Sequence, residues 1–377
     1  MKVAITLLVF CVAALLALGL VMLYSSSMTQ VGAHYLRMQL LWSLMGIVSC
    51  VAVAAIDYAL LRKYAWFILG AIVVLLILVF IPHIGAGAKG GAQRWLALGP
   101  FRLQPSEPAK LALILIMAWY CERYQRRMHE WKRGILIPGL IIAPVLGLIF
   151  IEPDRGSTIL AAAVLSAVML AAGVRWYYFM VPAIAAVVGL AISFWHDPMR
   201  SARIYSWLHL EETKLDKGHQ AYQAQIALGS GGWTGLGLGN GRQKLGFVPE
   251  HHTDFIFSII GEELGLIATI LVVAAFVTVL LCGVFISLRS RDNFGLYVGF
   301  GITTLISLQA FINIGVVTSA LPNKGLPLPF ISYGGSNLLM MLTCVGVLLS
   351  IARHARETVS KPDAMLAPAN PFSPRTA

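Results

Sequence analysis

Residues 254–288 read DFIFSIIGEELGLIATILVVAAFVTVLLCGVFISL. The 34 residues after Asp254 contain two charged side chains, Glu262 and Glu263. A helix of that length would measure about 51 Å at about 1.5 Å per residue, whereas the hydrocarbon core of a bilayer is about 30 Å thick. We therefore predict a transmembrane helix that tilts or protrudes. The two glutamates are either functional groups at membrane depth or solvated groups on the protruding part.

Nine further segments are apolar and long enough, or nearly so, to cross a bilayer as helices. Their apolar residues are continuous rather than alternating, which excludes the strands of a membrane β-barrel. The ten predicted spans are Val3–Tyr24, Met38–Ile56, Ala65–Ile81, Glu107–Cys121, Gly134–Ile151, Ser157–Val174, Trp176–Trp195, Phe255–Leu288, Phe294–Leu321 and Ser332–Ile351. The sequence thus predicts an all-α polytopic membrane protein.

The composition of the whole 377-residue chain agrees with this prediction. Hydrophobic residues make up 58% of it and charged residues 12%, with a mean hydropathy of +0.78. A soluble domain is about 45–50% apolar and about 25% charged. These values exclude a soluble enzyme, a disordered protein and a nucleic-acid-binding module, so the net charge of +11 does not indicate a nucleic-acid partner.

The distribution of that charge predicts the orientation in the membrane. Ten spans place both termini on one side, which carries 15 of the 28 Lys and Arg residues but 6 of the 17 Asp and Glu residues. Because Lys and Arg concentrate in cytoplasmic loops, we expect both termini to be cytoplasmic. Residues 1–356 would form the membrane domain, and the proline-containing residues 357–377 a disordered cytoplasmic tail.

The longest loops then lie on the outer side, at residues 196–254 between the seventh and eighth spans and at residues 82–106. Loops longer than about 15 residues are usually functional or disordered. Several tryptophans and tyrosines in the first loop argue against disorder. We therefore look for chemistry on the outer face.

Asp254 lies at the outer mouth of the eighth predicted span. It could cap that helix, because Asp is a favoured N-cap residue, or act as a general base at the membrane surface. Ser258, Gly261 and Gly265 share its helix face. Such small residues would let another helix or a ligand approach closely.

A glycine-rich run precedes this residue, with seven glycines in the 13 residues 229–241. Glycine permits tight turns and exposes backbone amides to an anion. The run lacks the strand-to-helix context of a dinucleotide site. A flexible loop and a phosphate-holding loop both fit, and Arg242 and Lys244 just after the run favour the second.

Residues 104–110, QPSEPAK, begin the fourth predicted span. Ser106 is a candidate N-cap, and Glu107 and Lys110 are three residues apart and can pair. The pair either anchors the helix start or presents Lys110, together with Arg94, to an anionic substrate.

Two tight outer segments complete the set. Residues 152–157, EPDRGS, form a tight turn because of their proline and glycine. This segment is either a plain turn, or Asp154 in it holds a cation or orients the lysine of the fourth span. Residues 321–336, LPNKGLPLPFISYGGS, contain three prolines and cannot be a helix interior. Irregular backbone near membrane depth is tolerated only where it lines a cavity or is covered by protein.

These stretches resemble the SEDS family (shape, elongation, division and sporulation), the polytopic peptidoglycan polymerases FtsW and RodA. The resemblance extends from the first span to about Ile351, and the FtsW branch is the more similar because of Lys244, GEELG at 261–265 and Lys324. Its motifs are RWLALGPFRLQPSEPAK (94–110), EPDRGST (152–158), ALGSGGWTGLGLGNGRQKLGFVPEHHTDFIFSIIGEELG (227–265) and LPNKGLPLPFISYGGSN (321–337).

The resemblance implies an inverting peptidoglycan glycosyltransferase. It would join a growing glycan, carried on undecaprenyl pyrophosphate, to the 4-hydroxyl of an incoming lipid II through a β-1,4 bond. Asp254 matches the family carboxylate that would take the acceptor proton. The residues expected to bind the substrate are Lys110, Arg94, Arg203, Arg242, Lys244, Glu107, Asp154, Lys324 and Ser332.

The resemblance also implies a setting and partners. These are the bacterial cytoplasmic membrane at the division septum, a class B penicillin-binding protein transpeptidase and other membrane proteins of the division machinery. A divalent cation, Mg or Mn, fits the chemistry, but the sequence shows no ligand set.

The alternatives are a lipid II flippase, a RodA-type elongation polymerase and a non-catalytic scaffold. The chain shows no internal repeat of the kind common in transporters.

Overall fold

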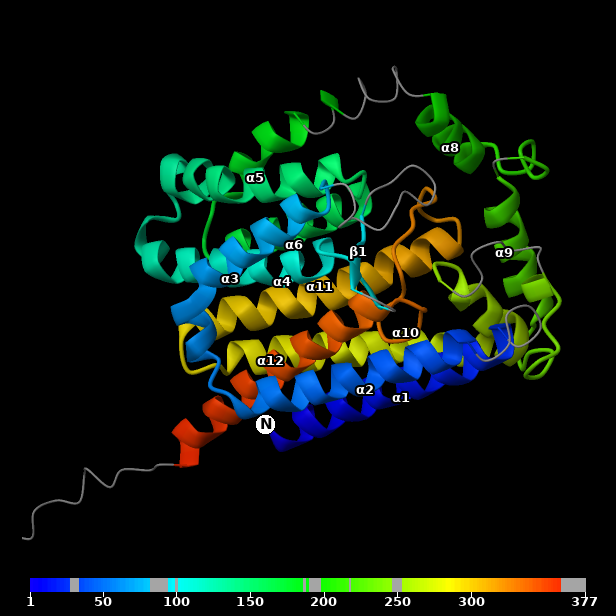
Figure 1. The fold of residues 1–377 in the computed structure, drawn as a ribbon, viewed down its shortest axis with the longest axis horizontal. Helices are drawn as coiled ribbons and strands as arrows, with labels where there is room; N and C mark the ends of the chain where they lie inside the picture. Colours follow the sequence, from blue (N-terminus) through cyan, green and yellow to red (C-terminus); the bar gives the residue numbers. More distant parts are fainter. Residues whose placement is uncertain are drawn as a thin grey trace, which may run out of the picture.

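The computed structural model describes residues 1–27, 34–81, 94–98, 101–185, 188–189, 198–216, 218–245 and 253–360. Long helices run side by side along the long axis of the molecule (Figure 1). Within the described ranges, seven helices are long and apolar enough to cross a membrane. They are α1 (Lys2–Ser27), α2 (His34–Ala55), α3 (Ala59–Leu78), α5 (Ile137–Ile151, with the preceding π turn Lys132–Leu136), α10 (Ile256–Leu288), α11 (Asn293–Val317) and α12 (Gly335–Ser360).

Two more of the predicted spans are helices too. They are α4 (Ser106–Tyr124), which carries charged residues, and α6 (Arg155–Ala171), which has 17 residues. The seventh predicted span, 176–195, lies partly outside the described residues. The predicted all-α polytopic class is confirmed, and the count of ten spans stays a prediction. Residues 361–377 of the predicted tail lie outside the described part, and α12 continues to Ser360.

Helix α4 is the innermost helix of the bundle. It packs against α3, α6 and α11, and its residues 109–118 are all buried. A helix that is apolar on all sides is stable only when protein or lipid surrounds it completely. The charged start of α4 is therefore also enclosed by protein.

Close helix crossings depend on small residues. Helix α2 packs along α12, and α1 packs along α10. A Cβ atom at Gly346 of α12 would lie 2.5 Å from the carbonyl oxygen of Cys50 in α2. Only glycine allows the two backbones to approach this closely, as in other membrane helix pairs.

Helix α10 corrects the expectation of one continuous protruding helix. Gly265 has φ 77° and ψ −174°, which is not helical, so α10 consists of two helical pieces that meet at this residue. The glycine-rich run packs against the break: the Leu266 amide of α10 donates to the Gly232 carbonyl of the run at 2.9 Å. Backbone groups freed by the break are thus satisfied by the neighbouring loop rather than by water.

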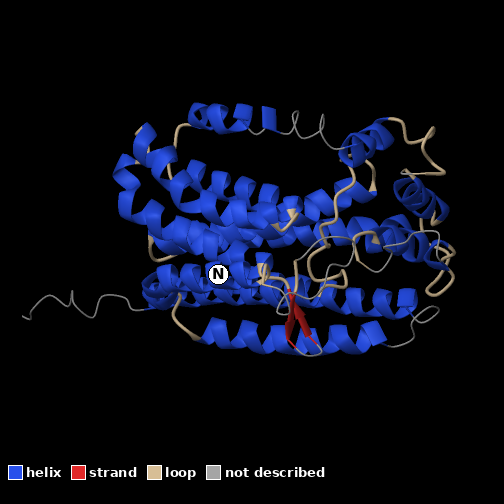
Figure 2. Ribbon diagram, turned by 45° about the horizontal axis from the view of Figure 1, so that its top comes forward, coloured by secondary structure: helices blue, strands red, loops and turns tan. Residues whose placement is uncertain are grey.

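The outer loops contain short elements that the sequence did not predict. Strands β1 (Leu96–Leu98) and β2 (Phe101–Leu103) form an antiparallel hairpin, which Figure 2 shows in red against the helices. Residues 198–245 include α8 (Pro198–Leu208), α9 (His219–Ser230) and a 3-10 turn at Gln243–Leu245. The order expected from the aromatic residues of this loop is therefore present in its described part.

The break in α10 gives a stability prediction. Gly265→Ala should lower the free energy of unfolding by more than about 2 kcal/mol, because a positive φ is unfavourable for alanine and its Cβ would lie 2.4 Å from the Gly235 nitrogen. The measurement is the thermal unfolding midpoint in detergent. Gly147→Ala in α5, where no atom lies within 4 Å of the new Cβ, is the control. Equal midpoints for the two variants would contradict the prediction.

Candidate active site

Asp254 lies in a turn, residues 253–255, directly before α10, and it is half-buried. The N-cap of α10 is Phe255 and no side chain caps the helix, so the N-cap interpretation of Asp254 is wrong. Its main-chain carbonyl accepts a hydrogen bond from Asn313 Nδ2 of α11 at 2.8 Å. Its Oδ2 lies 2.6 Å from the position that a Cβ at Gly325 would take. The carboxylate therefore lies directly against the loop between α11 and α12.

This α11–α12 loop, residues 318–334, is held by two amide side chains of α11. Gln309 Nε2 donates to the carbonyl of Pro327 at 2.9 Å. Asn313 Nδ2 donates to the carbonyl of Leu326 at 2.7 Å. Both amides are buried, so they supply hydrogen bonds that water cannot.

Ser332, a predicted substrate ligand, has a role within this loop. Its hydroxyl accepts a hydrogen bond from the Leu328 amide at 2.8 Å, and its carbonyl accepts one from Gln39 of α2 at 3.1 Å. The side chain is buried. Ser332 thus shapes the loop, and contact with a substrate stays a prediction.

The charged start of α4 forms a buried network. Lys110 Nζ lies 2.9 Å from the Glu107 carboxylate, which confirms the predicted pair, and the two side chains are 1% and 3% exposed. Asn337 of α12 donates to Glu107 at 2.8 Å. Lys110 also donates to Gln309 Oε1 at 3.3 Å. The lysine is therefore bonded inside the bundle, and its predicted contact with the substrate pyrophosphate remains untested.

Asp154 joins three segments at the outer end of the bundle. It caps α6 by accepting from the Ser157 amide at 3.1 Å. Gln104 Nε2 and Ser106 Oγ each donate to it at 2.8 Å. Ser106 is therefore not the N-cap of α4, which is Pro105. Asp154 orients these groups rather than the lysine of α4.

Lys324, in the α11–α12 loop, is within electrostatic range of Asp154. Burial lowers the pKa of the Lys324 ammonium group, and the negative charge of Asp154 opposes that shift. The carboxylate thus helps to keep the lysine protonated. Because Gly325 follows directly and touches Asp254, the loop brings a cation and two carboxylates to one place.

Glu152, in the turn between α5 and α6, was not predicted as a site residue. It is fully buried, and within the described part of the chain neither carboxyl oxygen has a hydrogen-bond partner. Burial raises the pKa of Glu152 to about 8; Asp154 raises it further and Arg94 lowers it. At neutral pH this carboxyl is therefore mostly uncharged.

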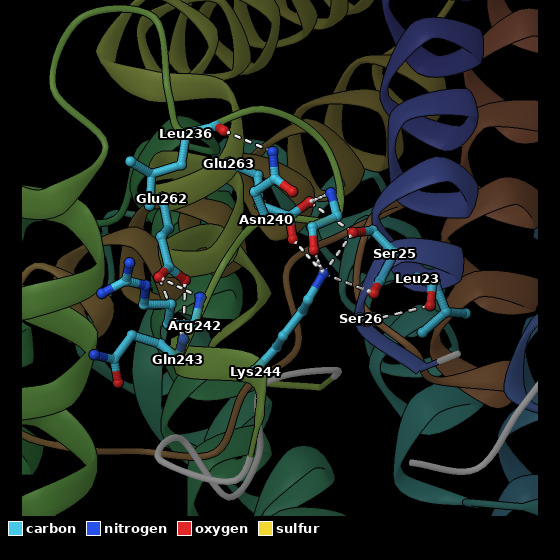
Figure 3. Close-up of polar contacts among 11 residues, drawn as sticks. Leu23, Ser25, Ser26, Leu236, Asn240, Arg242, Gln243, Lys244, Glu262 and Glu263 are labelled. Atoms are coloured by element: carbon cyan, nitrogen blue, oxygen red, sulfur yellow. Dashed lines mark hydrogen bonds and ion pairs between the residues drawn. The ribbon is translucent and has the colours of Figure 1, made fainter. Parts of the chain in front are cut away.

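A second polar cluster joins the glycine-rich run to α1 and α10 (Figure 3). Lys244 Nζ lies 2.7 Å from the Glu263 carboxylate, and the two side chains are 2% and 0% exposed. The ammonium group also donates to the carbonyls of Ser25 at 3.1 Å and Gly239 at 2.9 Å. A buried ammonium with this many acceptors is an internal anchor, and a phosphate contact for Lys244 remains untested.

The backbone amides of the run also bind an anion, but it belongs to the protein. Glu262 accepts hydrogen bonds from the amides of Arg242 at 2.7 Å and Gln243 at 3.2 Å, and Glu263 accepts from the Gly239 amide at 3.1 Å. Both glutamates are buried, so the solvated interpretation is wrong. Phosphate binding at this run would therefore depend on the Arg242 side chain.

Arg242 is exposed and lines a cavity of about 520 Å³. Figure 3 shows its guanidinium group and the Gln243 amide on the same side of the loop, away from Lys244. The other lining residues are Ile226, Ser230, Leu236, Asn240 and Glu262. Its exposure would allow the guanidinium group to meet an anionic ligand.

The two remaining predicted arginines lie in the outer segments. Arg94 precedes β1, and its buried Nε has no hydrogen-bond partner. Arg203 lies in α8, and its side chain is outside the described part of the structure. Helix α8 is tied to the α11–α12 loop, since Trp207 Nε1 donates to the Ser319 carbonyl at 2.8 Å.

The described residues do not form a metal centre by themselves. No group of three or more His, Cys, Asp and Glu side chains in the described ranges could hold an ion. Asp154 is already bonded to a hydroxyl, an amide side chain and a backbone amide. Since Mg is often held by one or two carboxylates with substrate phosphates completing the shell, the cation remains a prediction tied to the bound substrate.

Gln309 and Asn313 are the residues that sequence reasoning missed. They are four residues apart in an apolar helix, so they share a face. Polar groups on one face of a transmembrane helix usually have a partner inside the bundle. The four-residue spacing therefore predicts that both amides have partners inside the bundle. It does not predict which backbone carbonyls they bind.

Comparisons with known families and with individual proteins point to the same family. The family described as "Cell cycle protein", comprising FtsW, RodA and SpoVE, matches residues 5–357. "Probable peptidoglycan glycosyltransferase FtsW" of Geobacter metallireducens is 40% identical over 351 residues, covering 92% of this chain and 93% of that protein. The protein of the same name from Pseudomonas fluorescens is 36% identical over 353 residues, covering 91% of this chain and 86% of that protein.

Solved structures show the same fold. One chain from a study of how a peptidoglycan synthase complex coordinates polymerization and crosslinking has a TM-score of 0.79 and 27% identity, covering 92% of this chain and 97% of that chain. The rod shape determining protein RodA of Thermus thermophilus has a TM-score of 0.69 and 26% identity, covering 92% and 95%.

The state of Glu152 gives a pH prediction. The ordinary pKa of 4.5 applies in the unfolded chain, against about 8 when folded, so stability falls as pH rises between these values and then levels off. Glu152→Gln removes this loss. Its unfolding midpoint should exceed that of the native chain more at about pH 9 than at about pH 5. A difference that is the same at both pH values would contradict the prediction.

The Lys244–Glu263 pair gives a second prediction. Lys244→Met leaves a buried carboxylate without its cation, which typically costs about 3–5 kcal/mol. Lys244→Met combined with Glu263→Leu should recover part of that stability, because no unpaired charge remains. Thermal unfolding in detergent measures both. A double variant less stable than Lys244→Met would show that the ion pair is not the source of the loss.

Proposed function

The chain belongs to the FtsW, RodA and SpoVE family of cell cycle proteins, and from this membership we propose that it is a peptidoglycan glycosyltransferase that polymerises lipid II at the division septum. The observation that supports this most directly is the meeting of Asp254 with the α11–α12 loop. Gly325, which faces the carboxylate, is exposed, and Asp254 is half-buried. A reactive group could therefore reach Asp254 from outside.

In the proposed reaction Asp254 is the general base. The 4-hydroxyl of the incoming lipid II gives its proton to the carboxylate, while its oxygen attacks the anomeric carbon of the growing chain. The bond from that carbon to the pyrophosphate breaks, and undecaprenyl pyrophosphate leaves with the electron pair. The new β-1,4 bond forms with inversion, because attack and departure are on opposite faces of the sugar.

Cations must stabilise the leaving pyrophosphate. Lys324 and Arg94 are the candidates near Asp154 and Glu152, where a mostly uncharged Glu152 adds no negative charge. Arg242 is the candidate in the separate cavity at the glycine-rich run. When bound, a Mg or Mn ion would add positive charge at the phosphates.

The buried glutamates of α10 count against the flippase alternative. A transporter would use carboxylates at membrane depth to bind its cargo or coupling ion. Glu262 and Glu263 instead bind backbone amides and Lys244 within the protein. Arg242 remains exposed beside this cluster, on the predicted outer side.

The partner follows from the same comparison. The solved peptidoglycan synthase complex couples polymerization to crosslinking, and a class B penicillin-binding protein would supply the crosslinking step here. We place the pair in the bacterial cytoplasmic membrane, at the septum with the other division proteins. The multi-pass membrane character is shown by the helices themselves.

Asp254→Asn tests the proposed base. The purified protein and its transpeptidase partner are incubated with lipid II, and glycan strands are quantified on a gel. We expect the rate to fall by at least about 100-fold, since general base catalysis typically contributes about 10²–10⁴. Asp216→Asn, an exposed aspartate in the turn after α8, is the control and should retain the native rate. Polymerisation at the native rate by Asp254→Asn would remove the base assignment.

A cellular assay separates the enzyme from a scaffold. In cells depleted of the native copy, the Asp254→Asn chain should reach the septum but fail to support division. Normal growth with that chain as the sole copy would favour the scaffold.

A further inference from the structure

We propose that Asn313 is a positioning residue for glycosyl transfer: its amide fixes the main chain of Asp254 to the loop that carries Lys324, and Gly325 leaves the space in which the carboxylate stands. This inference rests on the proposed function, because it assigns Asp254 the role of base. It concerns a side chain that is 1% exposed in the middle of α11. Asn313 itself need not touch the substrate.

The hydrogen bonds of Asn313 join two segments that are far apart in the sequence. One Nδ2 group donates to the Asp254 carbonyl at 2.8 Å and to the Leu326 carbonyl at 2.7 Å. An NH₂ group carries two hydrogens, so both donors are used. The turn before α10 and the α11–α12 loop are therefore tied through a single nitrogen atom.

The other end of the amide shows that this donation is the purpose of the side chain. Asn313 Oδ1 is buried and has no hydrogen-bond partner among the residues that the structure describes. A buried polar atom without a partner is unfavourable and rare in native proteins. An apolar residue would avoid that loss, so what asparagine contributes here is its pair of donors.

Gly325 provides an independent constraint on the same carboxylate. A Cβ at this position would lie 2.6 Å from Asp254 Oδ2, and apart from the adjacent residues no other described group lies within 4 Å of it. Gly325 is exposed, and its φ is not in the positive region that favours glycine. A side chain at this position would therefore displace the carboxylate of the base rather than strain the loop backbone.

The buried network of α4 supports the position of Asn313. One turn earlier on α11, Gln309 donates to the Pro327 carbonyl and accepts from Lys110. The pair of Lys110 with Glu107 thereby fixes the face of α11 that presents both amides. This arrangement gives the buried lysine a role in placing the loop.

The test compares kinetic constants for lipid II polymerisation. Asn313→Leu keeps the branched arrangement of the side-chain heavy atoms and lacks the donors, so kcat should fall by about 100-fold, the effect of misplacing a reactive group by about 1 Å. KM should stay within about twofold, because the substrate contacts remain. Thr303→Val is the matched control: this buried threonine of α11 bonds only the Gly299 carbonyl of its own helix, and kcat should be native.

Gly325→Ala guards against a folding defect in the first variant. It is exposed, so its unfolding midpoint should match the native value while kcat falls. The combination of Asn313→Leu with Asp254→Asn should be no slower than Asp254→Asn alone, since the base is already absent.

A kcat within about twofold of native for both Asn313→Leu and Gly325→Ala would overturn the inference. So would an equal fall in Thr303→Val, or a further fall in the double variant. If Asp254→Asn itself polymerises at the native rate, the proposed function fails as well, and the two failures are thereby distinguished.

Discussion

Backbone groups that leave a helix inside a membrane bundle must find hydrogen bonds from the protein, because water is scarce there and lipid offers none. Two places in this chain depend on that constraint. At the break in α10, the glycine-rich run and the carboxylates of Glu262 and Glu263 bind each other. In the α11–α12 loop, the carbonyls are bound by Gln309 and Asn313. These buried polar side chains hold the irregular segments of the outer face in place.

The same constraint separates the charges of the protein into two groups. Lys110 and Lys244 are buried and paired with glutamates, so their charges balance internal carboxylates. Lys324 and Arg242 are less enclosed and lie where a ligand could meet them. All four cations lie in the sequence motifs of the outer side, so residue type alone does not separate the two pairs. Their division follows from burial, since a buried cation needs a permanent partner and an accessible one does not.

Parts of the site could be predicted from local spacing. The pairing of Glu107 with Lys110 follows from three residues on one helix turn, and it is present. The close approach allowed by Gly261 is also present, because Gly231 of the run packs against its carbonyl. The partners of Asp154 and Lys244 could not be predicted in this way. Gln104 is 50 residues from Asp154 and Ser25 is 219 residues from Lys244, and single-sequence spacing contains no such distances.

The sequence by itself determined that this is a helical membrane protein with a polar outer face, because hydrophobicity and helix length act locally and are independent of partners. It also placed Asp254 at the mouth of a span. Only the tertiary structure decided that Gly265 breaks this span and that the α11–α12 loop meets the carboxylate. The physical reason is that backbone hydrogen bonds in these irregular segments are completed by side chains of other helices, and packing alone brings them together.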